Sequence, residues 1–295
     1  MIVSASYRTD IPAFYGDWFL NRFTAGYAKV RNPYGGPVST VPLHQGVDGF
    51  VFWTRNAAPF RPALRAVRRA GIPFVVTYTV TGYPRALEIS VIEADKAVAD
   101  IRALADEFGP RAVVWRYDPI LLSSLTPADF HLEIFARLAG ALAGAVDEAT
   151  LSFANIYRKT ARNLAAAARA HGFDWWDPPA EDKRALAARL GELAASHGMR
   201  ATICSQADYT VAGTSPAACI DARRLEDVAA GWGVPRTVTA RRKGNRPGCE
   251  CFESRDIGDY DTCPHGCTYC YAVGSRALAK RRYQAHDPTA ESLYP

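Results

Sequence analysis

The sequence predicts an α/β fold built on a parallel barrel. Short runs of β-branched and aromatic residues alternate with longer amphipathic stretches, a pattern typical of repeated strand–helix units. Glycines follow four of the helical stretches, at Gly71, Gly109, Gly172 and Gly198, where helices commonly end. Six such units fit a partial (β/α)6 barrel, and a full eight-stranded TIM-like barrel is the alternative.

The expected elements alternate along the first two thirds of the chain. The expected strands cover residues 2–6, 49–53, 73–80, 112–116, 150–153 and 200–204. The expected helices cover residues 13–23, 60–70, 93–108, 128–145, 158–171 and 180–197. Pro127 and Pro179 stand at two helix starts, where a residue without a backbone N–H is tolerated.

Two regions depart from this alternation. Residues 26–42 contain two short β-rich runs around Asn32, Pro33, Gly35 and Gly36, which is turn chemistry, and they predict an inserted β-hairpin. After residue 205 the pattern loosens, and a basic stretch at 239–247 leads into a cysteine-rich end. We therefore expect a barrel domain at 1–235 and a cysteine-rich segment at 236–295 that packs on it.

Polar side chains cluster where the expected strands end. In a barrel of parallel strands, functional residues gather at the carboxyl ends, so these side chains are the candidate catalytic residues. Single members also have structural interpretations, such as a surface ion pair of little energetic weight or a helix-start turn at Asp118-Pro119. The candidates are Arg8 and Asp10, Arg55 and Asn56, Arg116 and Asp118, and Asn155.

A short loop near the C-terminus contains three cysteines, Cys263, Cys267 and Cys270, spaced C-x-x-x-C-x-x-C. Structural zinc requires four closed ligands, and electron-transfer iron–sulfur clusters usually have four thiolates. Three thiolates leave one valence open. The loop therefore indicates a 4Fe–4S cluster with one iron free to bind another molecule; a structural zinc site and buried, inert cysteines are the alternatives.

This loop, with Tyr269 before its last cysteine, resembles the cluster loop of the radical S-adenosylmethionine (radical SAM) superfamily. The resemblance implies that the open iron binds the amino and carboxylate groups of SAM and that Tyr269 packs near the adenine. It further implies one-electron cleavage of SAM to methionine and a 5′-deoxyadenosyl radical, which abstracts hydrogen from a substrate. The electron would come from a donor such as flavodoxin or ferredoxin, while the protein positions the substrate.

The order of segments 4–12, 51–56, 114–119, 219–221 and 256–258 before the loop resembles a prokaryotic family of unknown function. The C-terminal cysteines of that family resemble the radical SAM loop, and the family carries no established reaction. The chain departs from most radical SAM enzymes in the late position of its loop and in lacking a Gly-Gly-Glu-like segment for the SAM amine. Asp10, Asp118, Asn56 or backbone carbonyls would have to replace that segment.

Four further cysteines, Cys204, Cys219, Cys249 and Cys251, lie outside the loop. If they converge, they suit a closed second site holding either zinc or a fully ligated 4Fe–4S cluster. Alternatively Cys204 and Cys219 are buried and inert, or one of the four completes the first cluster and closes its open valence. A closed first cluster would argue against catalysis.

Composition excludes several classes of protein. A hydrophobic content of 48% without a run of about 18–20 apolar residues predicts no membrane span. The N-terminus lacks a secretory pattern, and the clustered cysteines fit a reducing cytoplasm. A net charge of +5 permits a small anionic substrate. The other functions considered are a non-catalytic iron–sulfur or zinc protein and, from basic runs near 241–246 and 280–282, a nucleic-acid-acting repair or modification protein.

Overall fold

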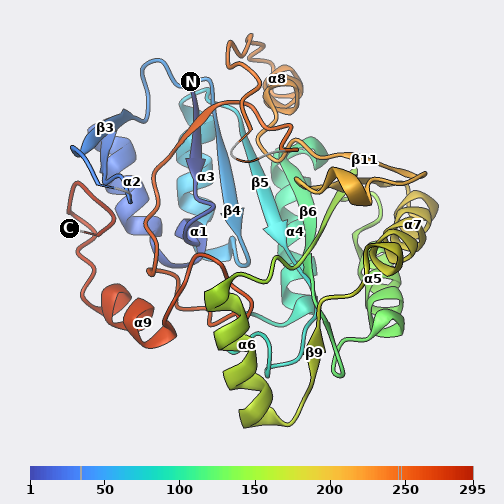
Figure 1. Ribbon diagram of the computed structural model, residues 1–295. Coiled ribbons are helices and arrows are strands. Elements are labelled where there is room, and N and C mark those ends of the chain that lie inside the picture. The colour runs from blue at the N-terminus through green and yellow to red at the C-terminus, as the bar shows by residue number, and fades with distance from the viewer. Residues whose placement is uncertain (34, 245, 247, 295) are drawn as a thin grey trace.

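A parallel sheet of eight strands forms the centre of the computed structural model, which describes residues 1–33, 35–244, 246 and 248–294 (Figure 1). Six of these strands match the predicted ones, and two strands of three residues each were not predicted. In chain order the strands are β1 (Ile2–Ala5), β4 (Gly49–Thr54), β5 (Phe74–Thr79), β6 (Val113–Ile120), β8 (Glu148–Phe153), β10 (Arg200–Ile203), β11 (Thr214–Pro216) and β12 (Ser254–Asp256).

The order of the strands is β11-β10-β8-β6-β5-β4-β1-β12, so from β1 to β11 the strands of this sheet that follow one another in the chain are also neighbours in space. The last strand, β12, pairs with the first, β1. A (β/α)8 barrel has this order and also a ladder between its seventh and eighth strands. Among the described residues no ladder joins β11 to β12. The predicted barrel is therefore not confirmed, and the established fold is a parallel sheet flanked by helices.

Helices flank this sheet and largely follow the predicted stretches. The expected helix at 13–23 is two helices that meet at Tyr15, and the last two helices were not predicted. Two small antiparallel pairs lie outside the central sheet: β2 (Tyr27–Val30) with β3 (Ser39–Pro42), and β7 (Leu122–Ser123) with β9 (Trp175–Trp176). The helices are α1 (Ile11–Phe14), α2 (Gly16–Ala25), α3 (Arg61–Arg69), α4 (Ala94–Phe108), α5 (Ala128–Leu142), α6 (Arg158–His171), α7 (Ala180–Ser196), α8 (Ala222–Gly231) and α9 (Arg276–Gln284).

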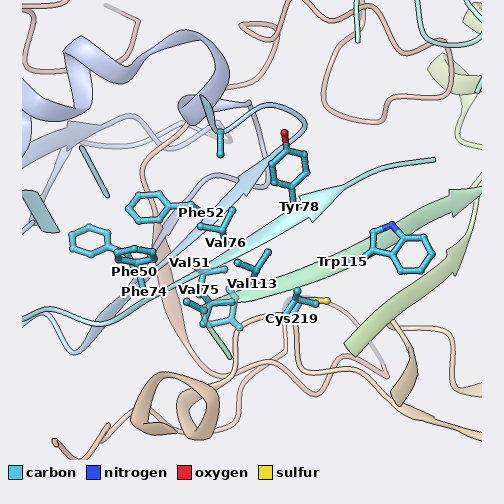
Figure 2. Packing of buried hydrophobic residues seen from close by; sticks show 14 of the residues in the cluster. Phe50, Val51, Phe52, Phe74, Val75, Val76, Tyr78, Val113, Trp115 and Cys219 are labelled. Carbon is cyan, nitrogen blue, oxygen red and sulfur yellow. The ribbon is translucent and has the colours of Figure 1, made fainter. Parts of the chain in front are cut away.

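The helix-covered face of the sheet holds an aromatic core. Phe50 of β4 pairs in register with Phe74 of β5, so their side chains point to the same face, as does that of Phe52 (Figure 2). Phe19 of α2 packs edge-on against both Phe50 and Phe52, at centroid distances of 5.7 and 5.4 Å. Burying each such side chain stabilises the fold by about 1.5–3 kcal/mol. This core fixes the strands whose ends carry the candidate site.

The opposite face of the sheet is more polar. The strand registers place Ser4, Trp53, Thr77, Arg116 and Asp256 on this one face, because alternate residues of a strand point the same way. Trp53 Nε1 donates to Ser4 Oγ over 3.0 Å, and Ser4 Oγ donates to Asp256 Oδ2 over 2.8 Å. The polar residues that follow the strands thus continue a polar face.

The C-terminal segment leaves the sheet at the carboxyl ends of the strands. Because β12 is parallel to β1, residues after Asp256 emerge beside residues after Ala5. The segment then passes through the three-cysteine loop into α9, which lies with α6 near the lower ends of the strands in Figure 1. Its end is attached to the first helices, where Trp18 Nε1 donates to the carbonyl oxygen of Ala290 over 3.0 Å. Within the described residues, no helix has the length and apolar character needed to span a membrane.

Candidate functional site at the carboxyl ends of the strands

Asp10 connects the ends of β1 and β4 to the three-cysteine loop. Its carboxylate accepts hydrogen bonds from the Thr54 hydroxyl over 2.7 Å and from the backbone N–H of Arg55 over 2.8 Å. His265, inside the loop, places Nε2 2.8 Å from Asp10 Oδ2, and both side chains are buried. The same carboxylate accepts from the N–H of Ala13 and caps α1. Asp10 is therefore a structural anchor for the loop.

A second anchor joins Arg55, Glu88 and Tyr269. Arg55 Nη1 lies 2.8 Å from Glu88 Oε1, and Arg55 Nη2 donates to the Tyr269 hydroxyl over 2.6 Å. The Tyr269 hydroxyl donates to Glu88 in turn, and the Thr81 hydroxyl donates to Glu88 over 2.6 Å. Burial opposes the charge of Arg55, but Glu88 and the Tyr269 hydroxyl hold the pKa of its guanidinium well above the ordinary value. Arg55 is thus a permanently charged group beside the loop.

Backbone hydrogen bonds fix the loop along the connection between β5 and α4. The N–H of Thr268 donates to the carbonyl oxygen of Leu87 over 3.0 Å, and the N–H of Ser90 donates to that of His265 over 2.9 Å. On the other side, the Tyr15 hydroxyl donates to the carbonyl oxygen of Thr262 over 2.6 Å. Tyr269 also packs edge-on against Tyr83, with ring centroids 5.8 Å apart. The loop is therefore held from both flanks.

The three loop thiols lie close enough to influence one another. Burial raises the pKa of Cys263, and Asp10, Cys270 and Cys267 raise it further. Burial raises the pKa of Cys267 to about 12, against the opposing charge of Arg55. Cys270 Sγ accepts a hydrogen bond from the N–H of Ala272 over 3.3 Å. Without a metal these groups are neutral thiols, so a metal would have to displace their protons.

Arg8 and Asp256 form a second polar group at the ends of β1 and β12. Asp256 accepts hydrogen bonds from Ser4 and Ser6 and from the N–H of Gly258, and its nearest oxygen lies 3.7 Å from Arg8 Nε. Burial raises the pKa of Asp256 in spite of these partners. Arg8 Nε is a buried donor with no hydrogen-bond partner among the described residues. Of the three predicted arginines, Arg8 therefore has the weakest internal ion pair.

Arg116 and Asp118, also predicted at a strand end, lie beside the other cysteines. Arg116 forms an ion pair with Asp118 and donates from Nη1 to Cys219 Sγ over 2.8 Å. Asp118 also accepts from the Ser152 hydroxyl. Asp118 and Pro119 lie within β6, so the alternative of a helix-start turn is wrong.

Aromatic and cationic side chains contact one another in succession near the ends of β1, β4 and β6. The guanidinium of Arg8 lies 5.5 Å from the ring centroid of Tyr260 and 5.6 Å from that of Tyr7. Tyr7 packs edge-on against Trp53 at 6.5 Å, and the guanidinium of Arg116 lies 5.0 Å from the Trp53 ring. Each such cation–π contact contributes about 0.5–2 kcal/mol. These contacts connect Arg8 to Arg116 through Tyr7 and Trp53.

The four remaining cysteines come together. Cys219 Sγ lies 3.3 Å from Cys204 Sγ. Cys219 also hydrogen-bonds Cys251, and Cys251 hydrogen-bonds Cys249. The sulfurs thus form a connected chain. In the described part of the molecule, no three or more His, Cys, Asp or Glu side chains are already arranged to hold a metal ion, in this group or in the loop.

Two predicted residues lie apart from these groups. Asn56 Oδ1 accepts from the N–H of Ala58 over 3.3 Å, just before the 3₁₀ turn Ala58–Phe60, which is a local structural role. Asn155 is exposed after β8, and its carbonyl oxygen accepts from the N–H of Tyr157. Sequence reasoning placed both with the strand-end candidates, but among the described residues neither side chain forms a hydrogen bond with the loop.

Three buried residues of the site were not predicted: Glu88, His265 and Asp256. His265 carried a usable signal, because it lies between two loop cysteines and imidazole readily bonds a carboxylate. Glu88 lies in a connection, well beyond the end of β5, where no pattern identified it.

A cavity of about 150 Å³ beside Arg55 and Glu88 is smaller than most ligand sites.

A family described as "Domain of unknown function (DUF1848)" matches residues 2–272, which is nearly the whole chain. The match gives no evidence of membership in the radical SAM superfamily. No curated protein matches the chain.

Proposed function

The chain belongs to the DUF1848 family, which has no assigned function, and we propose that it is a radical-SAM-like iron–sulfur enzyme acting on a small or anionic substrate. The observation that carries this proposal is the attachment of a three-thiol loop to the carboxyl ends of parallel strands. Two buried anchors make the attachment, Asp10 with His265 and Arg55 with Glu88 and Tyr269. A loop with a purely local structural role would not need both.

The loop supplies the three thiols that a 4Fe–4S cluster with one open iron requires. Cys263, Cys267 and Cys270 would hold it, which leaves one iron without a protein ligand. The backbone N–H of Ala272 already donates to Cys270 Sγ, as amides near cluster thiolates commonly do. When bound, such a cluster supplies the electron for reductive cleavage of SAM, and a small electron-transfer protein such as flavodoxin or ferredoxin would reduce it.

The side chains around the loop would each contribute to this chemistry. Arg55 places a permanent positive charge beside Cys267, which would favour its thiolate form. Asp10 and His265 hold the loop in position, because both are buried and each satisfies the other. The Tyr269 hydroxyl donates to Glu88 and accepts from Arg55, so the ring of Tyr269 is the part that would pack against a ligand.

Arg8 is the best placed of the three arginines to bind an anionic group. Arg55 is already paired with Glu88 and Arg116 with Asp118, whereas Arg8 Nε lies 3.7 Å from Asp256 and has no hydrogen-bond partner among the described residues. A guanidinium with an unused donor fits a carboxylate or phosphate. Such a group belongs either to SAM or to the substrate.

The test is reductive cleavage of SAM by anaerobically reconstituted protein, measured as methionine and 5′-deoxyadenosine by liquid chromatography. We expect the wild type to form both products when dithionite supplies electrons. Replacing Cys263, Cys267 or Cys270 by alanine should abolish product, because each thiolate is required. Glu107→Gln, a surface change in an ion pair with Arg61 and Arg65, is the control and should leave the rate unchanged.

Two results would overturn the proposal. A wild-type protein that takes up iron and sulfide but forms neither product would be a non-catalytic iron–sulfur protein. A protein whose loop takes up zinc and no iron would be a structural zinc protein. In both cases the three-thiol loop would serve folding or electron transfer.

A further inference from the structure

We propose that Cys204, Cys219, Cys249 and Cys251 bind one zinc ion that joins the two ends of the central sheet. The ion would be fully coordinated by protein and would therefore be structural. This inference is independent of the proposed radical chemistry, since it uses none of the loop residues.

The sulfur positions favour a single ion over a second cluster. Zinc–sulfur bonds of about 2.3 Å in tetrahedral geometry place adjacent sulfurs about 3.8 Å apart. Cys219 Sγ and Cys204 Sγ are 3.3 Å apart, and Cys251 hydrogen-bonds both Cys219 and Cys249. A 4Fe–4S cluster binds each thiolate to a different iron and spaces them more widely.

Two guanidinium groups and a backbone amide lie near the sulfurs. Arg116 Nη1 donates to Cys219 Sγ over 2.8 Å, and Arg246 Nη2 lies 4.0 Å from Cys204 Sγ. The backbone N–H of Ile220 donates to Cys251 Sγ over 3.3 Å. A tetrathiolate zinc site carries net negative charge, so two guanidinium groups and an amide donor would stabilise it. This gives Arg116 a role distinct from binding substrate.

The four cysteines occupy the place where the sheet has no ladder. Cys204 directly follows β10, Cys219 lies just after β11, and Cys249 and Cys251 precede β12. The N–H of Phe252 donates to the carbonyl oxygen of Ile220 over 2.9 Å, so the chain before β12 already contacts the chain after β11 at one point. An ion shared by these segments would hold β11 against β12, and the free energy of metal binding would become folding free energy there.

The proposed zinc can be tested by metal analysis of protein purified in air, which removes oxygen-sensitive iron from the loop. We expect about one zinc per chain in the wild type. Cys219→Ser and Cys251→Ser should lose most of it. Cys267→Ser is the matched control, because it changes a half-buried thiol outside the group, and it should retain the zinc. Cobalt substitution of the wild type should give the intense visible bands of a tetrahedral tetrathiolate site.

The outcomes separate this inference from the iron–sulfur proposal. Wild-type protein that binds neither zinc nor cobalt in this group would overturn it. Reconstituted protein with about eight irons per chain, of which Cys251→Ser loses about four, would replace zinc by a second cluster. Cobalt bands that survive in both Cys219→Ser and Cys251→Ser would place the metal elsewhere. Absence of SAM cleavage would leave the zinc inference intact.

Discussion

The buried ion pair of Arg55 and Glu88 allows the attachment of the loop to be tested by substitution. Glu88→Gln keeps the size of the side chain and removes its charge, which leaves the Arg55 guanidinium without a counter-ion. The two side chains are 10% and 4% exposed, so solvent cannot compensate. Removing one partner of a buried pair costs about 3–5 kcal/mol. The Tyr269 and Thr81 hydroxyls would also lose their strongest acceptor.

The assay is urea denaturation followed by circular dichroism. With a urea dependence of about 3 kcal/mol per molar, the expected loss lowers the midpoint by about 1 M or more. Glu107→Gln is the matched control, since Glu107 also pairs with arginines but is 26% exposed. Its expected cost is about 0–1 kcal/mol. Equal midpoints for Glu88→Gln and Glu107→Gln would refute the view that a buried pair attaches the loop.

Four further outcomes are expected. Arg8→Ala should weaken binding of SAM or of an anionic substrate analogue by about tenfold, measured by calorimetry, because a charge-assisted hydrogen bond is lost; unchanged affinity would remove Arg8 from the site. Because the pKa of Asp256 is raised in the folded state, its contribution to stability is full below about pH 4 and falls as the pH rises through its folded-state pKa. Asp256→Asn should therefore flatten the decline in unfolding free energy above pH 4. An unchanged slope of unfolding free energy against pH would contradict this. Zinc binding should release about four protons at pH 7, since the pKa values of Cys219 and Cys251 are both raised to about 12. Calorimetry in buffers of different ionisation enthalpy counts the released protons. Release of almost no protons would mean that the cysteines are already thiolates in the metal-free protein. His265→Ala should reduce iron retention by the loop more than Asn56→Ala does, because His265 bonds Asp10 from within the loop. Equal iron retention by the two variants would contradict an anchoring role for His265.

Six strands could be predicted because each contains apolar or β-branched residues in a short run, most of which are buried. Val75 and Val76 in β5 are both buried, as parallel strands covered on two faces require. β11 and β12 have three residues each, which is too short for an alternation of apolar and polar residues to be recognised. Whether the sheet closes depends on contacts between segments far apart in the sequence, which no local pattern records.

The rule that functional residues lie at strand ends located most of the candidate site, but it did not show that these residues divide between two groups of cysteines. It predicted that Asp10, Arg55 and Arg116 would share one site. In the structure Asp10 and Arg55 contact the three-cysteine loop, whereas Arg116 contacts Cys219. The neighbour of each arginine is set by side-chain packing across the polar face, and the sequence does not encode that packing locally. Glu88 could not be predicted either, because it lies in a connecting segment and not at a strand end.

The most direct test of the account is electron paramagnetic resonance of the reduced, anaerobically reconstituted protein, recorded at low temperature with and without SAM. We predict the signal of one reduced 4Fe–4S cluster, a change in that signal when SAM is added, and no signal in Cys267→Ala. A cluster signal that SAM leaves unchanged would contradict the claim that the loop presents an open iron to SAM.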